Sequence, residues 1–401
     1  MEDFDNLSRP ALDNRGFPLT PAKLESKTFV DDTSTLIRGT LASVCDACMR
    51  VGRKYKQMAI RLKLKLSPKA ELQTSTPNIA KALVEDLRAE GIFFKTPVES
   101  RDLGATTSLG KTMNLSLLRA RNKIVLPKIT KISRLAQTNR SARKLYSGSG
   151  FSSNTYGHPV SGITENMLIG MERKAVNCSG ITPQGRCRFT ALVLAFGPRG
   201  HPRGRVIKET FTAWFKVLKE LEEQDMTDIL HSFWTEASDL LKNRYDSQKP
   251  NIMEQAIASF IHNIISLLIK VGWNPKSFNV WIDPRGDEWQ LIGSNRKTAA
   301  HIIIQHIVDD SNLIQLKRAG QHYNAKGIEL GVDWSASLQQ LRTYKNKNNY
   351  SRWCALETIQ AAASWFLARA HVCHPDVSPI CSECEEADQD DLHAFWTCYS
   401  Y

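Results

Sequence analysis

The side chains with the most specific chemical pattern lie near the end of the chain, where Cys381, Cys384, His393 and Cys398 form a Cys-x2-Cys-x8-His-x4-Cys array. Zinc takes four sulfur or nitrogen ligands at tetrahedral angles, and a Cys-x2-Cys turn presents two thiolates from one bend. The His-x4-Cys half has a spacing at which a second local element supplies the other two ligands. The array predicts one structural zinc ion, because four protein ligands leave no open position for catalysis. The alternative is four unlinked residues in a cysteine-containing tail.

A pair of adjacent carboxylates, Asp31 and Asp32, is the second feature with chemical potential. Short apolar segments at Phe29-Val30 and Leu36-Ile37 flank the pair, which favours a hairpin with an acidic turn. Two carboxylates at one point suit a hard divalent cation such as magnesium. Two such ions can activate a 3′-hydroxyl and stabilise the leaving oxygen in phosphoryl transfer. An ordinary solvated acidic turn has the same appearance, so both interpretations stand at this point.

Positive charge is concentrated in one part of the chain. The formal net charge is +12, yet no Asp or Glu occurs between Leu103 and Thr164. The basic block in that span consists of ten residues, Lys111, Arg119, Arg121, Lys123, Lys128, Lys131, Arg134, Arg140, Arg143 and Lys144. Such a block is typical of a surface that binds a phosphate backbone. A solvated basic face without a partner is the alternative.

Cysteine usage and hydropathy exclude two classes of protein. Nine cysteines occur without a signal peptide, since the N-terminus is acidic, and this favours a reducing compartment. The longest apolar run, residues 257–271, contains His262 and Asn263 and is too short to cross a bilayer. We therefore expect an intracellular protein, nuclear or cytoplasmic, that is neither secreted nor bound to a membrane.

The first hundred residues mix helix and strand patterns. A helix is expected over residues 41–60, followed by a strand at 61–66 because Arg-Leu-Lys-Leu-Lys-Leu alternates with a period of two. Thr76-Pro77 predicts the start of a second helix and Gly91 its end. A short strand is expected at residues 92–94. This order predicts an α+β fold.

Helical periodicity dominates from Leu115 onward. A buried stripe recurs at four-three-four-three spacing through Ile207, Phe211, Trp214, Leu218 and Leu221. A hairpin around a Pro/Gly turn is expected at residues 280–291. Its tryptophans are interpreted as core anchors, with base-stacking platforms as the alternative.

Several of these segments, taken in order, resemble a known family. Three segments resemble the palm of a reverse transcriptase. Phe29-Val-Asp-Asp32 resembles its catalytic hairpin, and Leu64-Lys-Leu-Ser-Pro-Lys69 resembles the following strand with its lysine. Asp102-Leu-Gly104 resembles the primer-grip entrance. Three further segments are similar to the thumb and linker of LINE-type (non-LTR) retrotransposon polymerases: Tyr156-Gly157, Gly162-Ile163 and Gly185-Arg-Cys187. The terminal cysteine–histidine array resembles the zinc module that follows the thumb in those proteins. The resemblance spans residues 28–398.

The resemblance implies a partial palm, a mainly α-helical thumb and linker, and a small zinc module. The corresponding domains are an irregular segment at 1–27, the palm part at 28–105, a basic thumb-like region at 106–200, a helical linker region at 201–370 and the module at 371–401. It also implies that Asp31 and Asp32 bind magnesium, that Lys69 protonates the pyrophosphate leaving group, and that the basic block holds an RNA–DNA template–primer. No oligomeric state follows from it.

Two departures from the family bear on activity. The family's palm contains an aspartate on an earlier strand, and fingers that hold the template and nucleotide; neither is found at the expected separation before Phe29. The chain is therefore expected to be a fragment of an RNA-directed DNA polymerase that is inactive by itself. A non-catalytic zinc-containing nucleic-acid-binding protein is the rival hypothesis, and a decaying pseudogene product is a third.

Overall fold

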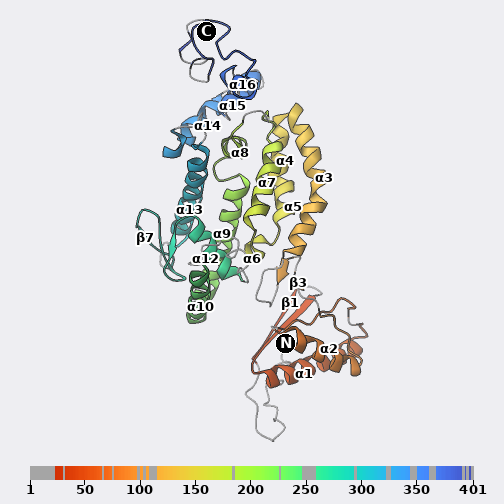
Figure 1. Ribbon diagram of the computed structural model, residues 1–401. Coiled ribbons are helices and arrows are strands. Elements are labelled where there is room, and N and C mark those ends of the chain that lie inside the picture. The colour runs from red at the N-terminus through yellow and green to blue at the C-terminus, as the bar shows by residue number, and fades with distance from the viewer. Residues whose placement is uncertain are drawn as a thin grey trace. The chain divides into compact units, whose positions relative to one another are not determined.

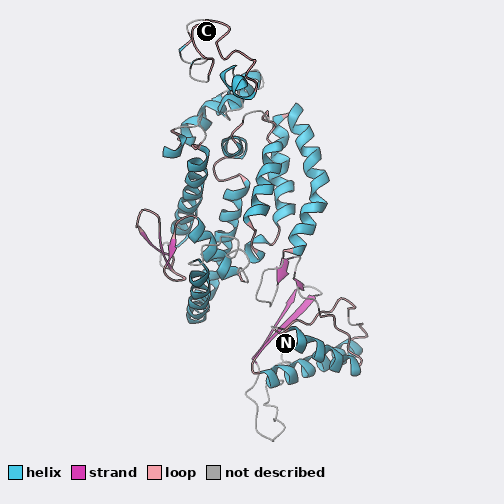
Figure 2. Cartoon of the chain, viewed as in Figure 1, coloured by secondary structure: helices cyan, strands magenta, loops and turns pink. Residues whose placement is uncertain are grey.

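Helices make up most of the chain in the computed structural model, and short antiparallel strands complete it (Figures 1 and 2). This content agrees with the expected α+β class. The chain divides into two units, Met1–Lys111 and Thr112–Tyr401. The structure describes residues 23–29, 32–65, 67–74, 76–96, 100–102, 105–107, 115–182, 186–224, 227–245, 259–292, 296–321, 327–343, 350–360, 367–390, 393 and 397–398.

The first unit contains the expected hairpin. Strands β1 (Lys23–Phe29) and β2 (Asp32–Arg38) are antiparallel, and Phe29 pairs with Asp32 at the end of the ladder. The prediction of a hairpin at this place is confirmed, with two residues between the strands. Asp31 is one of those two and lies outside the described residues. A second, shorter hairpin pairs β3 (Ser100–Asp102) with β4 (Ala105–Thr107).

Two helices, α1 (Leu41–Arg61) and α2 (Pro77–Ala89), supply the core of this unit. They approach closely, because a Cβ atom at Gly52 would lie 2.6 Å from Leu87 Cδ2. Gly91 follows α2 with φ +72, a conformation that favours glycine. Both helices confirm the sequence prediction.

The strand predicted at residues 61–66 is wrong. Helix α1 runs to Arg61, and the Leu64 N–H then bonds to the Ala59 carbonyl with Lys63 in the left-handed region at φ +56. Leu62 and Leu64 are 58% and 63% exposed. Alternating leucines form a strand only where a neighbouring strand accepts their backbone groups and one face is buried. Among the described residues no strand pairs with this segment, and the helix end takes up its N–H groups.

The position of Lys69 changes accordingly. Lys69 lies in an exposed turn, where its N–H donates to Ser67 Oγ at 3.2 Å, and not at the end of a strand. The strand predicted at residues 92–94 is also wrong, since these described residues form no ladder and a single bridge joins the nearby Glu71 and Lys95. Ile92 is nevertheless fully buried, which explains its apolar character.

The second unit begins with α3 (Ser116–Thr138), which lies along one edge of a helical bundle (Figure 1). The bundle continues with η2 (Arg140–Ala142), α4 (Arg143–Leu145), the π-helical turn η3 (Tyr146–Phe151), α5 (Ser152–Thr155), α6 (His158–Ser161), α7 (Glu165–Asn177) and α8 (Arg188–Phe196). The inner face of α3 contributes Leu118, Val125, Ile129 and Ile132 to the core that these elements share. Its other face is left to solvent.

A second core fills the adjoining half of this unit. It is built by α9 (Pro202–Glu223), α10 (Thr227–Tyr245), α12 (Phe260–Lys270), α13 (Arg296–Ala319) and an antiparallel sheet of β5 (Asn274–Pro275), β6 (Val280–Ile282) and β7 (Glu288–Gln290). Phe211 and Trp214 of the predicted stripe are fully buried. The rings of Phe211 and Trp281 meet edge to face at 5.5 Å. This contact confirms that Trp281 of the predicted hairpin is a core anchor.

Short helices lead from this core to the cysteine–histidine array. They are η5 (Ile328–Leu330), α14 (Trp334–Thr343), α15 (Tyr350–Gln360) and α16 (Leu367–Cys373). The Ala368 N–H on α16 donates to the Gln389 carbonyl within the array, so backbone hydrogen bonding holds the array against this helix. None of the described helices combines the length and the apolar character needed to cross a membrane.

Candidate metal centre and basic surface

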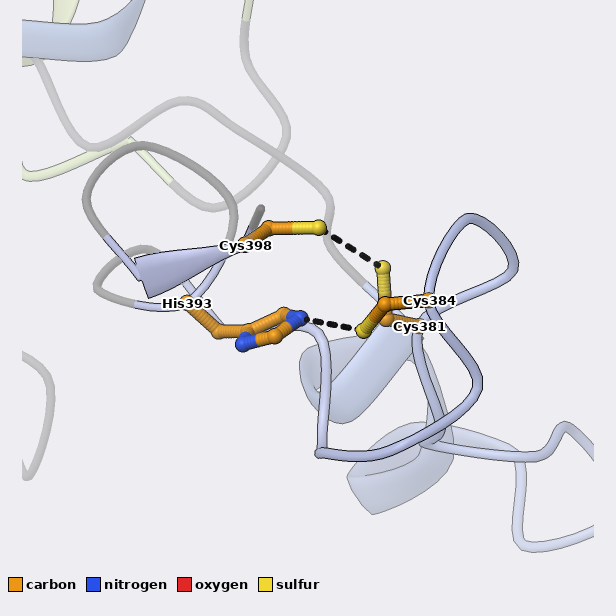
Figure 3. Close-up of side chains that lie close together, drawn as sticks. All are labelled: Cys381, Cys384, His393 and Cys398. Atoms are coloured by element: carbon orange, nitrogen blue, oxygen red, sulfur yellow. Dashed lines mark hydrogen bonds between the residues drawn. The ribbon is translucent and has the colours of Figure 1, made fainter. Parts of the chain in front are cut away.

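The four side chains of the terminal array converge on one point (Figure 3). Their ligand atoms all lie within 4.8 Å of one another. Cys381 Sγ and Cys398 Sγ are 4.0 Å apart, and Cys384 Sγ lies 3.0 Å from His393 Nε2. Two Zn–S bonds of 2.3 Å at a tetrahedral angle place their sulfurs about 3.8 Å apart. The array can therefore hold a metal ion such as zinc.

The Cys-x2-Cys half is shaped by a tight backbone turn. An isolated antiparallel bridge joins Ile380 to Asp388, and the Cys381 N–H donates to the Ala387 carbonyl at 2.8 Å. The Glu385 N–H returns to the Cys381 carbonyl at 2.9 Å, with Glu385 at φ +60. These bonds fold residues 380–388 back on themselves, so that Cys381 and Cys384 face the same side.

The His-x4-Cys half is a separate turn. The His393 N–H donates to Asp390 Oδ1 at 2.7 Å, and the Cys398 N–H donates to the His393 carbonyl at 2.8 Å. Thr397 Oγ1 lies 3.3 Å from His393 Nδ1, which leaves Nε2 directed at Cys384. A hydrogen bond at one ring nitrogen fixes which nitrogen can bind a metal. Nε2 is thus the ligand atom.

The local field favours the thiolate form of Cys381. Backbone N–H groups of Cys384 and then Glu383, followed by the His393 and Cys384 side chains, lower the pKa of the Cys381 thiol to about 6. Gln389 Nε2 donates to the same sulfur at 3.7 Å. Thiolates are the form that binds metals. A lowered thiol pKa therefore favours metal binding at this array.

No protein-family model, curated protein or solved structure matches this chain. Among the described residues, no second group of three or more His, Cys, Asp and Glu side chains lies close enough to hold a metal.

The proposed catalytic residues are only partly placed. Asp32 begins β2, opposite Phe29, and Asp31 lies outside the described residues. Lys69 is exposed in its turn. The described part of the chain gathers no carboxylate cluster at the hairpin, so magnesium binding there is unsupported by geometry.

The nine described members of the basic block differ in exposure and in partners. Lys111 lies outside the described residues. Six members are exposed, five on α3 and one on α4: Arg119, Lys123, Lys128, Lys131, Arg134 and Lys144. Arg119 and Lys123 are four residues apart, and Lys128, Lys131 and Arg134 follow one another at intervals of three, so each of these two subsets occupies neighbouring positions on the exposed side of α3. The five exposed cations of α3, without Lys144, are called the α3 basic face below.

Arg140 and Arg143, in contrast, are engaged inside the protein. Both bind Glu357 on α15, with Nη1 of Arg140 at 2.9 Å and Nη1 of Arg143 at 2.5 Å from its two carboxylate oxygens. Glu357 is fully buried. Sequence reasoning missed it, although an acid between Leu356 and Ile359 in an apolar stretch is a signal for a buried charge.

Arg121, the remaining member of the block, faces a tyrosine. Its guanidinium carbon lies 5.2 Å from the centre of the Tyr156 ring, and its Nη1 donates to the Tyr156 carbonyl at 2.6 Å. Arg121 is two residues from both Arg119 and Lys123, so it points to the other side of α3 from them.

Proposed function

We propose that the protein binds nucleic acid through the α3 basic face, with zinc stabilising its C-terminal module. The observation that carries the proposal is the exposure of five cations on one helix within a stretch that contains no acid. Arg119 and Arg134 are fifteen residues apart, which is about 22 Å along a helix. That length matches roughly six phosphates on one strand.

The cationic surface also differs from an ordinary solvated helix. Elsewhere in the unit exposed lysines lie among acids: Lys219 pairs with Glu223 and Lys276 with Glu288. On α3 no such compensation is possible within the helix, because its sequence lacks Asp and Glu. Uncompensated charge of this kind attracts polyanions and repels other cations.

Neutralising four members of the α3 basic face should weaken the salt dependence of binding. Arg119, Lys123, Lys131 and Arg134 are changed together to Gln, and affinity for a DNA duplex is measured by filter binding from low to high salt. Binding of the unchanged protein should fall steeply with salt, because each phosphate contact releases counterions and contributes about 0.9 to the log–log slope. The slope should lose about 0.9 for each contact removed.

The matched control removes the same charge from other surfaces of the unit. It carries Gln at four exposed lysines, Lys208, Lys216, Lys219 and Lys276. The control should keep the original slope. A flat salt dependence, or equal slopes for the two variants, contradicts binding through α3.

A second candidate is favoured by the β1–β2 hairpin, namely the template–primer-binding part of a reverse transcriptase. Phe29 pairs with Asp32 in this hairpin, and these two residues are the described ends of the segment that resembles a catalytic hairpin. This candidate uses the α3 basic face in the same way and adds an RNA–DNA duplex as the specific ligand.

For this candidate we expect template–primer binding without primer extension. Two-metal phosphoryl transfer requires carboxylates that hold both cations at a short fixed distance, and no cluster of that kind occurs among the described residues. Primer extension on an RNA template with magnesium or manganese is the assay. Extension that is abolished by Asp31→Ala/Asp32→Ala would instead make the chain a polymerase.

A further inference from the structure

Lys174 on α7 is a half-buried cation whose side-chain hydrogen bond in the described structure goes to a neutral group. Its Nζ donates to Asn122 Oδ1 on α3 at 3.2 Å. Burial lowers the pKa of the ammonium, and among the described residues no carboxylate forms an ion pair with it to offset the burial. A cation removed from water without an opposite charge costs free energy. An anion supplied by a ligand would offset that cost.

The acids of α7 are bound elsewhere. The helix has two, Glu165 and Glu172, and both form ion pairs with Arg203 of α9, at 2.5 and 2.9 Å. Glu172 is two residues before Lys174, so it points to the other side of α7. The helix that Lys174 reaches, α3, contains no acid. The boundary between α3 and α7 therefore carries positive charge that neither helix neutralises.

Side-chain contacts hold α3 and α7 side by side at this boundary. Besides the bond between Lys174 and Asn122, Ser133 Oγ on α3 donates to the carbonyl of Asn177, the last residue of α7, at 3.0 Å. Arg119 is exposed and lies three residues before Asn122, one turn away on the same side of α3. The Lys174 ammonium and Arg119 are thus cations of two different helices near one amide.

We propose that Lys174 binds a phosphate of the nucleic-acid backbone where α7 meets α3, together with Arg119 of the α3 basic face. The inference rests on the proposed nucleic-acid binding and adds a residue of α7 to the surface that contacts the ligand. An ammonium has three N–H donors, and Asn122 accepts from one, which leaves two for phosphate oxygens. Contacts to phosphates position a protein on nucleic acid without reading its sequence. The site should therefore bind duplexes of different sequence equally.

The test measures binding of the full chain to a DNA duplex by filter binding from low to high salt. Lys174→Met removes the charge and keeps an unbranched side chain. It should weaken binding about tenfold at low salt, because hydrogen bonds to charged groups contribute that much. The log–log slope should fall by about 0.9, the value for one phosphate contact. Lys174→Arg keeps the charge and should keep the slope.

The matched control is Lys219→Met, which removes one lysine whose ammonium is already paired with Glu223. Its affinity and slope should equal those of the unchanged protein. A loss of affinity in this control as large as that in Lys174→Met would mean that any lysine of the unit contributes equally, and it would overturn the inference.

Urea denaturation tests the alternative that Lys174 only supports the fold. Lys174→Met should be at least as stable as the unchanged protein, because it removes a desolvated charge. Asn122→Asp supplies a carboxylate within the protein, so it should raise stability and weaken binding of the duplex, since the ammonium is then neutralised. Lower stability of Lys174→Met with unchanged affinity and slope would make Lys174 a structural contact and overturn the inference, as would unchanged binding in both variants.

The outcomes also separate this inference from the proposed function. If the unchanged protein binds duplexes with a steep salt dependence and the fourfold α3 variant reduces the slope, but Lys174→Met does not, only the site at α7 fails. If the unchanged protein binds no duplex at low salt, nucleic-acid binding and the site at α7 fail together.

Discussion

Purified protein will contain one zinc ion per chain, and Cys384→Ser will lose it. The four ligand atoms already lie within 4.8 Å of one another, and Cys381 carries a lowered thiol pKa. Structural zinc contributes on the order of 10–16 kcal/mol of apparent binding free energy in small zinc modules at pH 7. Few other interactions in a module of this size contribute as much free energy. Removing one of the four ligands should therefore abolish stoichiometric zinc binding. Elemental analysis after gel filtration measures it.

Cys373→Ser is the matched control for the zinc prediction. Cys373 is exposed at the end of α16 and lies outside the ligand set, so its loss should leave the zinc content unchanged. Zinc binding should also slow amide exchange in residues 380–390, where the backbone turn presents two of the ligands. A metal content near zero, or one unaffected by Cys384→Ser, contradicts the assignment.

The cysteine–histidine cluster that can hold a metal could be predicted from the sequence because its four residues are local. Cys381 and Cys398 are seventeen residues apart, and each half of the array is one turn whose geometry follows from its spacing. The β1–β2 hairpin and the stripe through Phe211 and Trp214 were predictable for the same reason. In each case a pattern within a few turns of chain determines the structure.

The failures arose where distant residues decide the outcome. The alternating leucines at positions 62 and 64 have the period of a strand, but a strand forms only if another strand pairs with it. The sequence pattern of charges also could not show which residues of the basic block are exposed and which are buried. Arg140 is inward-facing because Glu357, 217 residues later, lies against it. The sequence thus predicts a cationic region but not which cations remain at the surface.

We expect the substitution Glu357→Gln in that buried charge cluster to lower the free energy of unfolding. Glu357 is fully buried and accepts from both arginines, whose side chains are only 10% and 13% exposed. Arg140 further donates to the Cys354 carbonyl at 2.7 Å and to Thr358 Oγ1 at 2.8 Å, so it cannot turn to solvent without breaking α15 contacts. Arg143 lies over the Trp353 ring at 5.1 Å. Removing the carboxylate charge leaves two desolvated cations facing each other.

The expected cost is about 3–5 kcal/mol in the free energy of unfolding, the usual penalty for removing one partner of a buried ion pair. Urea denaturation followed by tryptophan fluorescence measures it for the second unit alone, because all nine tryptophans follow Lys111. Glu288→Gln is the matched control: its bridge to Lys276 is 47% and 51% exposed, and its loss should cost less than about 1 kcal/mol. Equal stabilities of the two variants would mean that Arg140 and Arg143 reach water once Glu357 is neutral. In that case both would add to the exposed cations of the basic block, and Glu357→Gln should bind nucleic acid more tightly than the unchanged protein.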